Sequence, residues 1–473
     1  MTNEMTGCYF LLTENCNLRC TYCFETGTRC VTKYMSEETA FKMVDFLFEE
    51  ARRSKTERNP QGDNVRITFF GGEPCLCPEM MTKILRYGLA KEKETGIPVR
   101  FSLITNGTIY NDKVEAFLEE WYTSTRRIDI QVSMDGTPEI QDINRPCANK
   151  NLSSSQLVVE ALEKFKAFYR KHNINPDALH IHTCIAKPSM PKLFEIYKYI
   201  TYTLKTRFKF AWVFEDEWDD EDVAIFDREL EKITADQCRN ETNANAFVFK
   251  AFNNCSGCAS GRKLICVDCD GDIYPCHRFF FYDPSKRKDV IFGNIHDENP
   301  INIERRKPFI EMDESKITDE ACQVCIAMNY CICGDMYKMP NLYNIEFMKI
   351  VNKYNAVFID CMERKNTARL LAQTTEEVKR LRQQVNEMDH LAKRVRYLET
   401  VLAANRMMDL PELPNNRGNN NGNGNRNGGS CNCNNGNRSG NCNGNGNNGG
   451  NRNSNPRGSA PMNCNDVDRR QLS

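Results

Sequence analysis

Short apolar runs alternate with longer amphipathic stretches along the first half of the chain. Runs of strand length begin near residue 7 and recur at 65–70, 101–105, 128–133, 179–186 and 208–214. Helical stretches lie between them, for example at 36–53 and 154–172. The first opens on Ser36 followed by acidic residues, which is typical of a helix start. Strands that alternate with helices need crossover connections, so the pattern predicts an α/β fold with a parallel sheet.

The pattern changes near the C-terminus. Residues 374–405 are charged, and their apolar positions step by three and four with a slip at Leu391: Val378, Leu381, Val385, Met388, Leu391, Val395, Leu398 and Leu402. This coiled-coil periodicity predicts a helix that forms a dimer or holds a partner. A single helix packed on its own domain is the alternative. Pro411 and Pro414 end the helix, and the Asn- and Gly-rich segment that follows cannot bury a core, so we expect disorder there.

Length and charge narrow the class of protein. The chain has 473 residues, which allows two or three domains, and its net charge of −1 gives no general attraction for nucleic acid. No run approaches the ~18 apolar residues of a membrane span. The first residues lack the basic and apolar pattern of a signal peptide. We therefore expect a cytoplasmic protein that contacts neither nucleic acid nor membrane.

The 24 cysteines are grouped as metal ligands are, rather than as the disulfides of a small secreted domain. In "LLTENCNLRCTYCFETG", Cys16, Cys20 and Cys23 have the spacing C-x3-C-x2-C. A structural zinc site is closed by four protein ligands, whereas three cysteines in one loop leave a position open to a cofactor or substrate. A zinc site completed from a distance by His180 or His182 is the alternative.

Four further motifs follow in order along the predicted strands. The run "VRITFF" leads into Gly71, Gly72 and Glu73, and glycines let backbone approach a ligand closely. Polar residues at or after the next strands are Asn106 in "FSLITNGT", Ser133 and Asp135 in "IDIQVSMDG", and Arg145 in "QDINRP". Each alone could be a turn or capping residue. Together they match the polar groups that gather at the carboxyl ends of parallel strands, where α/β folds bind ligands.

The cysteine triad, with Tyr22 at its aromatic position, and these four motifs resemble the radical S-adenosylmethionine (SAM) enzymes. The resemblance implies a partial (β/α)6 barrel in which Cys16, Cys20 and Cys23 bind a [4Fe–4S] cluster and SAM chelates the fourth iron. It also implies that the Gly71-Gly72-Glu73 motif meets the SAM amino group. Asn106 and Ser133 would lie near its ribose or carboxylate, and Arg145 near the carboxylate.

A second group of cysteines resembles the SPASM extension of radical SAM enzymes. Cys258, Gly271 and Cys276 fit its first part, and Cys322, Cys325 and Cys331 fit C-x2-C-x5-C, although Cys333 follows at C-x-C rather than C-x3-C. The resemblance implies one auxiliary [4Fe–4S] cluster on Cys258, Cys276 and Cys333, and another on Cys322, Cys325, Cys331 and Cys361. The first would take a fourth ligand from Cys255, Cys266 or Cys269, or keep an open iron. Two zinc knuckles are the alternative.

The same resemblance implies an activity. In this family a reduced cluster and SAM yield a 5′-deoxyadenosyl radical, and auxiliary clusters accept or relay the electron that an oxidised product releases. SPASM enzymes include anaerobic sulfatase maturases, which have Asp after the cysteine of the G-x4-C motif, and peptide maturases. Here that position is His277, a candidate catalytic residue, in "YPCHRF". This favours thioether or related crosslink formation in a Cys-containing precursor peptide, with three [4Fe–4S] clusters, SAM and a one-electron donor such as flavodoxin or ferredoxin. A sulfatase-maturase-like enzyme and a non-catalytic iron–sulfur scaffold are the alternatives.

We expect five segments along the chain: a radical SAM core at 1–215, a linker at 216–254, a SPASM auxiliary-cluster domain at 255–365, an amphipathic helix at 366–409 and an Asn/Gly-rich tail at 410–473.

Overall fold

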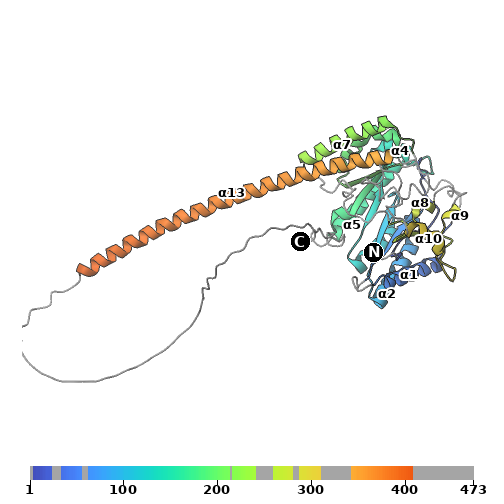
Figure 1. Cartoon of the computed structure of the whole chain (residues 1–473), viewed down its shortest axis with the longest axis horizontal. Helices are drawn as coiled ribbons and strands as arrows, with labels where there is room; N and C mark the ends of the chain where they lie inside the picture. The colour runs from blue at the N-terminus through green and yellow to red at the C-terminus, as the bar shows by residue number, and fades with distance from the viewer. Residues whose placement is uncertain are drawn as a thin grey trace, which may run out of the picture. The chain divides into compact units, whose positions relative to one another are not determined.

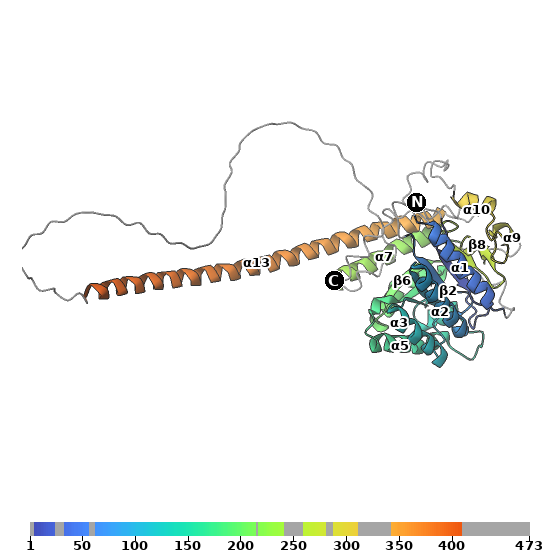
Figure 2. The same ribbon diagram turned by 90° about the horizontal axis from the view of Figure 1, so that it is seen from below.

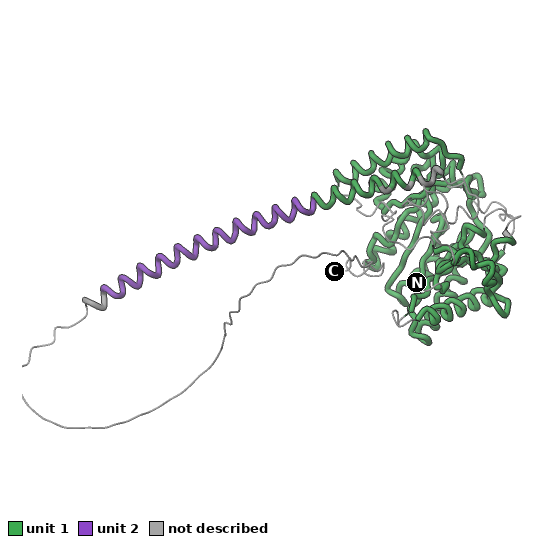
Figure 3. Tube along the Cα trace, in the orientation of Figure 1, with its two compact units in different colours: residues 1–364 green, residues 365–473 purple. Residues whose placement is uncertain are grey.

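The structure, a computed structural model, describes residues 4–23, 33–55, 62–213, 216–240, 259–280, 287–310 and 342–408. The chain forms two compact units, Met1–Arg364 and Lys365–Ser473 (Figure 3). The expected Asn/Gly-rich tail at 410–473 lies outside the described residues. No helix among those residues has the length and apolar character needed to cross a membrane.

The six predicted strands are confirmed as one parallel sheet in unit 1. They are β1 (Gly7–Leu11), β2 (Val65–Phe70), β3 (Val99–Thr105), β4 (Ile130–Ser133), β5 (Leu179–Ile185) and β6 (Arg207–Trp212). Each pairs in parallel with the next along the chain. Strands that follow one another in the chain become neighbours in the sheet when every crossover has the same handedness. Because the six strands are parallel, their carboxyl ends lie at one edge of the sheet.

Helices connect the strands along the outside of the sheet (Figures 1 and 2). Ser36 caps α1 by accepting a bond from the Thr39 backbone N–H at 3.0 Å, which confirms the predicted helix start. The α-helices up to the last strand of this set are α1 (Glu37–Arg53), α2 (Pro78–Thr95), α3 (Asp112–Thr125), α4 (Pro138–Asn144), α5 (Ser154–Lys171) and α6 (Leu193–Lys198). Shorter helical turns are η1 (Pro74–Leu76), η2 (Pro176–Ala178), η3 (Lys187–Lys192) and η4 (Tyr199–Thr203).

The two faces of the sheet differ in polarity. In β2 the side chains of Val65, Ile67 and Phe69 are fully buried, and they alternate with partly exposed Thr68 and Phe70. The face that carries Thr68 is the more polar one, because the register places Ser102 beside Thr68 and their hydroxyls lie 2.9 Å apart. Period-two alternation therefore gives one face to the hydrophobic core and leaves a second face with polar groups.

The sheet is longer than the predicted six strands. Within the part of the chain that the structure describes it has nine, in the order β6-β5-β4-β3-β2-β1-β7-β8-β9, and the added strands are β7 (Leu264–Val267), β8 (Asp272–Tyr274) and β9 (Gly293–Asn294). β7 pairs in parallel with β1, so the first part of the expected SPASM segment is built on the core sheet. The physical reason is that β1 would otherwise be an edge strand with unpaired N–H and C=O groups.

Two helices lie within or across the expected segments. The expected linker at 216–254 contains α7 (Asp220–Asn240), whose Phe226, Leu230 and Ile233 are buried. The predicted C-terminal helix is confirmed but starts earlier, because α13 runs continuously over Leu342–Met408. Between β8 and α13 the described residues include the short helices α8 (His277–Phe280), α9 (Arg287–Val290) and α10 (Ile303–Ile310).

The first turns of α13 pack on unit 1 beside α7 (Figures 1 and 2). The fully buried Phe347 ring lies 4.9 Å from Phe226, 5.3 Å from Trp212 and 5.1 Å from Trp218, measured between ring centroids. This aromatic cluster explains why the helix begins well before its coiled-coil pattern does, since tertiary packing rather than periodicity stabilises the first turns.

Gly71 and Gly72 let the end of β2 pass very close to the loop that follows β1. Gly71 has φ +94°, and a Cβ on it would lie 2.8 Å from Leu11 Cα and from the Thr13 carbonyl oxygen. A Cβ on Gly72 would lie only 2.0 Å from the Asn15 carbonyl oxygen. The next residue, Glu73, donates its backbone N–H to that same oxygen at 2.9 Å. The glycines therefore hold the cysteine loop against the sheet.

Gly72→Ala should displace this loop, because its methyl group would overlap the Asn15 carbonyl. We expect a loss of at least about 3 kcal/mol in the free energy of unfolding, measured by chemical denaturation, together with weaker iron binding. Gly96→Ala is the matched control. Gly96 also has positive φ (+70°) but nothing lies within 4 Å of its Cβ position, so a loss of about 1 kcal/mol is expected. Equal losses in the two variants would contradict the close-approach argument.

Phe347→Ala should cost about 3–5 kcal/mol in the unfolding of unit 1, since it removes the centre of an aromatic cluster. The control is Val357→Ala on the same helix, where the side chain is 48% exposed and a change below about 0.5 kcal/mol is expected. Thermal and chemical denaturation monitored by tryptophan fluorescence would measure both. A Phe347→Ala protein as stable as the control would show that the helix does not pack as described.

Candidate functional site

The carboxyl edge of the sheet brings the candidate residues together. The cysteine loop follows β1, Glu73 follows β2, Asn106 follows β3, Ser133 ends β4, and Arg145 follows α4. Because parallel strands end at the same edge, residues that are far apart in sequence become neighbours there.

The cysteine loop is fastened at several points by backbone hydrogen bonds. The Arg19 N–H donates to the Pro146 carbonyl at 2.7 Å, and the Thr21 N–H donates to the Asn144 carbonyl at 2.8 Å. The Ala148 N–H donates to the Asn17 carbonyl at 2.9 Å. The segment after α4 therefore supports the loop along most of its length.

Hydrogen-bond donors surround two of the three candidate sulfur ligands. The Leu18 N–H lies 3.4 Å from Cys16 Sγ, and Asn106 Nδ2 lies 3.7 Å from the same sulfur. Arg145 Nη1 lies 4.0 Å from Cys20 Sγ. Donors of this kind stabilise thiolates and raise the potential of an iron–sulfur cluster that those thiolates hold.

The donor set of this loop fits an iron–sulfur cluster. Cys16, Cys20 and Cys23 are partly exposed and form no disulfide. Within the described ranges, no three His, Cys, Asp or Glu side chains already converge as a metal-ligand group. This holds for Cys16, Cys20 and Cys23 themselves as well as for their combination with His180 or His182, so the described residues contain no preassembled site of either kind.

The Glu73 side chain is completely buried, and its carboxylate accepts three hydrogen bonds from neighbouring groups. Its Oε1 accepts from the Cys75 N–H at 2.9 Å and the Thr105 hydroxyl at 2.7 Å, and its Oε2 accepts from the Asn106 N–H at 2.7 Å. Burial raises the pKa of Glu73, and the three donors oppose that rise. The carboxylate therefore ties β2 to the end of β3, which makes Glu73 a positioning residue in this geometry.

Asn106 links β3 to the cysteine loop. Its Nδ2 donates to Asn17 Oδ1 at 2.8 Å, and its Oδ1 accepts from the Thr108 N–H at 2.9 Å and the Thr108 hydroxyl at 2.6 Å. Asn17 in turn donates to the Thr108 hydroxyl at 2.8 Å. Sequence reasoning missed Asn17 and Thr108, because a short polar residue next to a motif carries no distinct signal.

A buried ion pair holds Arg145 in place. Its Nε donates to Asp135 Oδ1 at 2.9 Å, and both side chains are at least nine-tenths buried. Asp135 also accepts from the Tyr22 hydroxyl, and the Arg145 guanidinium lies 5.3 Å from the Tyr22 ring centroid. Burial opposes the charge, yet Asp135 and Tyr22 hold the pKa of Arg145 well above its usual value. Arg145 is thus charged, and it is oriented by a residue of the cysteine motif.

The polar face of β5 continues from this ion pair. The Cys184 N–H donates to Asp135 Oδ1 at 3.1 Å, and His182 lies beside Ser133 in the register. Burial lowers the pKa of His182 to about 4, and Arg145 adds to this effect. Burial also lowers the pKa of His180 to about 3. Both histidines are therefore neutral at physiological pH.

The residues of the expected first auxiliary site lie at β7 and just after β8. Cys266 is buried on β7 beside Tyr9, Cys269 Sγ donates to the Leu11 carbonyl at 3.3 Å, and Cys276 is partly exposed. His277 starts α8, and its ring lies 4.4 Å from that of Tyr9 and 5.0 Å from that of Phe70. Burial lowers the pKa of His277 to about 3, so the imidazole is neutral.

The remaining predicted ligands are mostly outside the described residues: Cys255, Cys258, Cys322, Cys325, Cys331 and Cys333. Cys361 is described, lies on α13 and is partly exposed.

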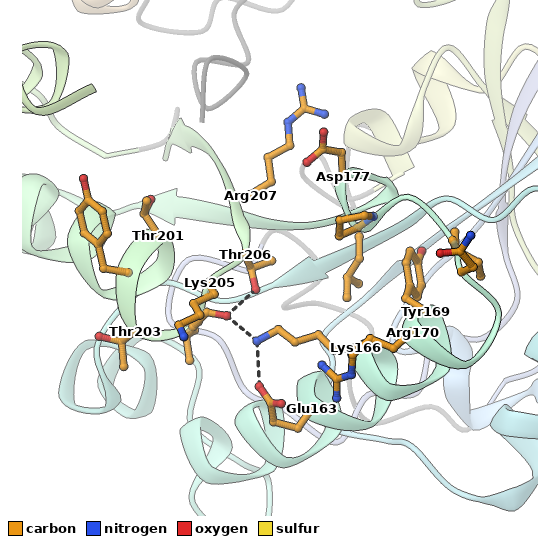
Figure 4. A pocket seen from close by; sticks show the side chains of 16 residues that line it. Glu163, Lys166, Tyr169, Arg170, Asp177, Thr201, Thr203, Lys205, Thr206 and Arg207 are labelled. Carbon is orange, nitrogen blue, oxygen red and sulfur yellow. Dashed lines mark hydrogen bonds and ion pairs between the residues drawn. The ribbon is translucent and has the colours of Figure 1, made fainter. Parts of the chain in front are cut away.

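A separate cavity of about 970 Å³ lies at the opposite end of the sheet, at the amino ends of β5 and β6 (Figure 4). Lys166 lines this cavity, and its ammonium group pairs with Glu163 and donates to the Leu204 carbonyl. The Thr206 hydroxyl donates to the same carbonyl at 2.9 Å. Because the predicted residues gather at the carboxyl ends, this cavity is not part of the candidate site.

Comparison with known proteins agrees with this geometry. Residues 10–180 match the Radical SAM superfamily, and residues 255–326 match an iron–sulfur cluster-binding domain, SPASM. A cysteine-type anaerobic sulfatase-maturating enzyme of Clostridium perfringens is 26% identical over 358 residues, which cover 68% of this chain and 86% of that protein. An uncharacterized protein of Methanocaldococcus jannaschii is 27% identical over 202 residues, and there the match spans 42% of this chain and 60% of the relative's length.

The fold has close counterparts among solved structures. Native anSMEcpe with bound AdoMet superposes with a TM-score of 0.57 at 21% identity, over 76% of this chain and 99% of that one. The same protein with bound AdoMet and Cp18Cys peptide gives a TM-score of 0.56. At this level of identity the likeness establishes the fold. From the two domain matches and the cysteine loop at the carboxyl edge of the sheet, we conclude that the chain contains a radical SAM domain and a SPASM iron–sulfur cluster-binding domain.

Proposed function

We propose that this enzyme oxidatively modifies a ribosomally made peptide, forming a thioether or related crosslink at its cysteines. The observation that carries the proposal is the convergence of the cysteine loop, Asn106 and Arg145 at one edge of the sheet. In this proposal Cys16, Cys20 and Cys23 hold a [4Fe–4S] cluster with an open iron for SAM. When bound, the cluster and SAM together supply a radical that removes hydrogen from an unactivated carbon.

The chain's own residues then have two tasks. Gly71, Gly72 and Glu73 fix the distance between the cysteine loop and the sheet, and this fixes where the open iron would lie. Arg145 and Asn106 present positive charge and an amide beside the sulfur ligands, and these groups suit the carboxylate and hydroxyl groups of SAM. Ser133 lies on the same polar face and would complete that contact surface.

We further propose two auxiliary [4Fe–4S] clusters, three in all, held by the cysteines of the SPASM segment 255–365. Forming a thioether replaces one S–H and one C–H bond by a C–S bond, so two protons and two electrons leave the substrate. One proton and one electron would leave together as the hydrogen atom taken by the radical derived from SAM. The second proton would be released, and clusters held by the cysteines of segment 255–365 would supply an acceptor for the second electron. A one-electron donor such as flavodoxin or ferredoxin would reduce the first cluster.

We place the protein in the cytoplasm, where thiols stay reduced, in keeping with cysteines that form no disulfide in the described ranges.

Sulfatase maturation is the second candidate function. It is favoured by relatives named anaerobic sulfatase-maturating enzymes, of which one matches 68% of this chain. Against it stands His277, since the maturases have Asp at that position in the motif. We propose that the neutral His277, whose ring packs against Tyr9 and Phe70, contacts the substrate rather than carrying charge.

Mass spectrometry would separate the two functions. The reduced enzyme and SAM would be incubated with a cysteine-rich peptide encoded beside the enzyme's gene, and separately with a peptide spanning a sulfatase's modified cysteine. A crosslinked product lighter by two hydrogens, with one thiol no longer alkylatable, would support the peptide-maturase proposal. Modification of the sulfatase peptide alone would replace that proposal with the second candidate.

Replacing Cys16, Cys20 and Cys23 together by Ala should remove one cluster of three. Anaerobically reconstituted wild-type protein should bind about 12 iron atoms and the variant about 8, because each [4Fe–4S] cluster contributes four. Formation of 5′-deoxyadenosine should fall to background. Cys238→Ala, on α7 and outside every proposed ligand set, should keep both values. Wild-type protein with about four iron atoms plus zinc would contradict the auxiliary clusters.

Asp135→Asn should destabilise the protein by about 3–5 kcal/mol, because it leaves the buried Arg145 charge without its counterion. It should also weaken SAM binding, measured by calorimetry on the reconstituted enzyme. The double variant Asp135→Asn/Arg145→Gln should recover part of the stability but not the SAM affinity. The exposed pair Arg86–Glu120 supplies the control, since Glu120→Gln should change neither quantity appreciably. Full SAM affinity in the double variant would show that Arg145 has only a structural role.

A further inference from the structure

The apolar stripe of α13 within unit 2 is exposed along its whole length. Leu381 is 48% exposed, Val385 64% and Met388 70%, and the stripe continues through Leu391, Val395, Leu398 and Leu402 at 50–63%. In contrast, Phe347 and Val351 near the start of the same helix are fully buried in unit 1. A continuous row of exposed aliphatic side chains on a soluble helix marks an interaction surface.

The spacing of the stripe fits a coiled coil. From Val378 to Leu402 its residues advance 24 positions in seven steps, about 3.4 positions per step. A stripe with the coiled-coil repeat of 3.5 would drift by about 20° per heptad on a straight helix of 3.6 residues per turn. Winding two helices around each other removes this drift and keeps the stripe facing its partner. Two consecutive steps of three, from Val385 to Met388 and on to Leu391, shift the register once and tighten the supercoil locally.

The residue types at the two core positions specify the number of strands. Before the shift Val378 and Val385 occupy position a, and Leu381 and Met388 occupy d. After it Val395 and Leu402 occupy a, and Leu391 and Leu398 occupy d. A β-branched residue at a with Leu at d favours two parallel helices over three or four. Val at a with Leu at d occurs on both sides of the shift, and Met388 and Leu402 are the two exceptions.

The charges at the flanking positions specify the partner and its direction. In a parallel dimer, position g of one helix faces position e five residues later on the other. Here Glu377 at g would face Arg382 of the second copy, and Arg394 at g would face Glu399 of the second copy. Both contacts are attractive, and each occurs twice in a symmetric pair. Within one helix Glu377 also pairs with Arg380 at 2.7 Å, but such an exposed contact is too weak to compete strongly.

We propose that residues 374–402 form a parallel, in-register, two-stranded coiled coil with a second copy of this chain. The proposal does not depend on the chemistry proposed above. It makes the enzyme a dimer held by unit 2, with two copies of unit 1 joined at their α13 helices.

The test is sedimentation velocity of the full-length, reconstituted protein. The chain has a mass of 54.6 kDa, and we expect a species of twice that mass at ~10 µM. Leu381→Asp/Leu398→Asp should weaken dimerisation by at least about a hundredfold, because both charges would enter the dimer core. Gln383→Asp/Thr400→Asp places the same two charges on the outer face two residues further on, and it should remain dimeric. Monomeric wild-type protein, or monomers of the outer-face variant alone, would overturn the proposal.

Charge reversal tests the parallel direction. Glu377→Lys should raise the dimer dissociation constant about tenfold, since Lys would face Arg382 of the second copy. Adding Arg382→Glu should restore the wild-type value. Glu376→Lys, the same reversal one residue earlier on the outer face, should have little effect. Circular dichroism should show equal helix content in all variants, so that unfolding is separated from dissociation. Weakening by Glu377→Lys without rescue by Arg382→Glu would overturn the parallel arrangement.

Discussion

The three hydrogen bonds to the buried Glu73 carboxylate determine the geometry of the carboxyl edge. Two of them join the segment after β2 to Thr105 and Asn106 at the end of β3, and the third comes from the nearby Cys75 N–H. The Glu73 backbone N–H donates to the Asn15 carbonyl of the cysteine loop. A buried carboxylate without such donors would be very costly, so the three segments cannot separate without exposing or orphaning it. Gly71 and Gly72 make the arrangement sterically feasible, because either side chain would push the loop away.

A second buried anchor acts from the other side of the cysteine loop. Asp135 follows β4 and engages Arg145, the Cys184 backbone and the Tyr22 hydroxyl. Since Tyr22 belongs to the cysteine motif, this carboxylate couples the loop to β4 and β5 much as Glu73 couples it to β2 and β3. Two buried carboxylates thus support a loop that carries three partly exposed cysteines. Rigid support beneath a reactive loop is what a positioned cofactor needs.

The sheet also joins the two cysteine-rich regions. β7 pairs with β1, and therefore Cys266 and Cys269 lie next to the strand that leads into Cys16. The strand order places His277 against Tyr9 and Phe70 of β1 and β2. The first strands of the expected SPASM segment therefore extend the core sheet beyond β1 rather than forming a separate sheet.

The sequence by itself determined the strands and helices of the core. Period-two and helical patterns predicted the six core strands and α1 with its Ser36 cap, because local burial and capping are encoded over a few residues. The cysteine spacing and the strand-end motifs predicted the candidate site, since parallel strands must end together. Only the tertiary structure decided the contacts among those residues. In the structure Glu73 accepts a hydrogen bond from Asn106 after β3, Arg145 forms an ion pair with Asp135, and β7 pairs with β1. These contacts join residues up to 258 positions apart in the chain. No local pattern records them, because they follow from which buried polar groups and which strand edges must find partners once the sheet has formed.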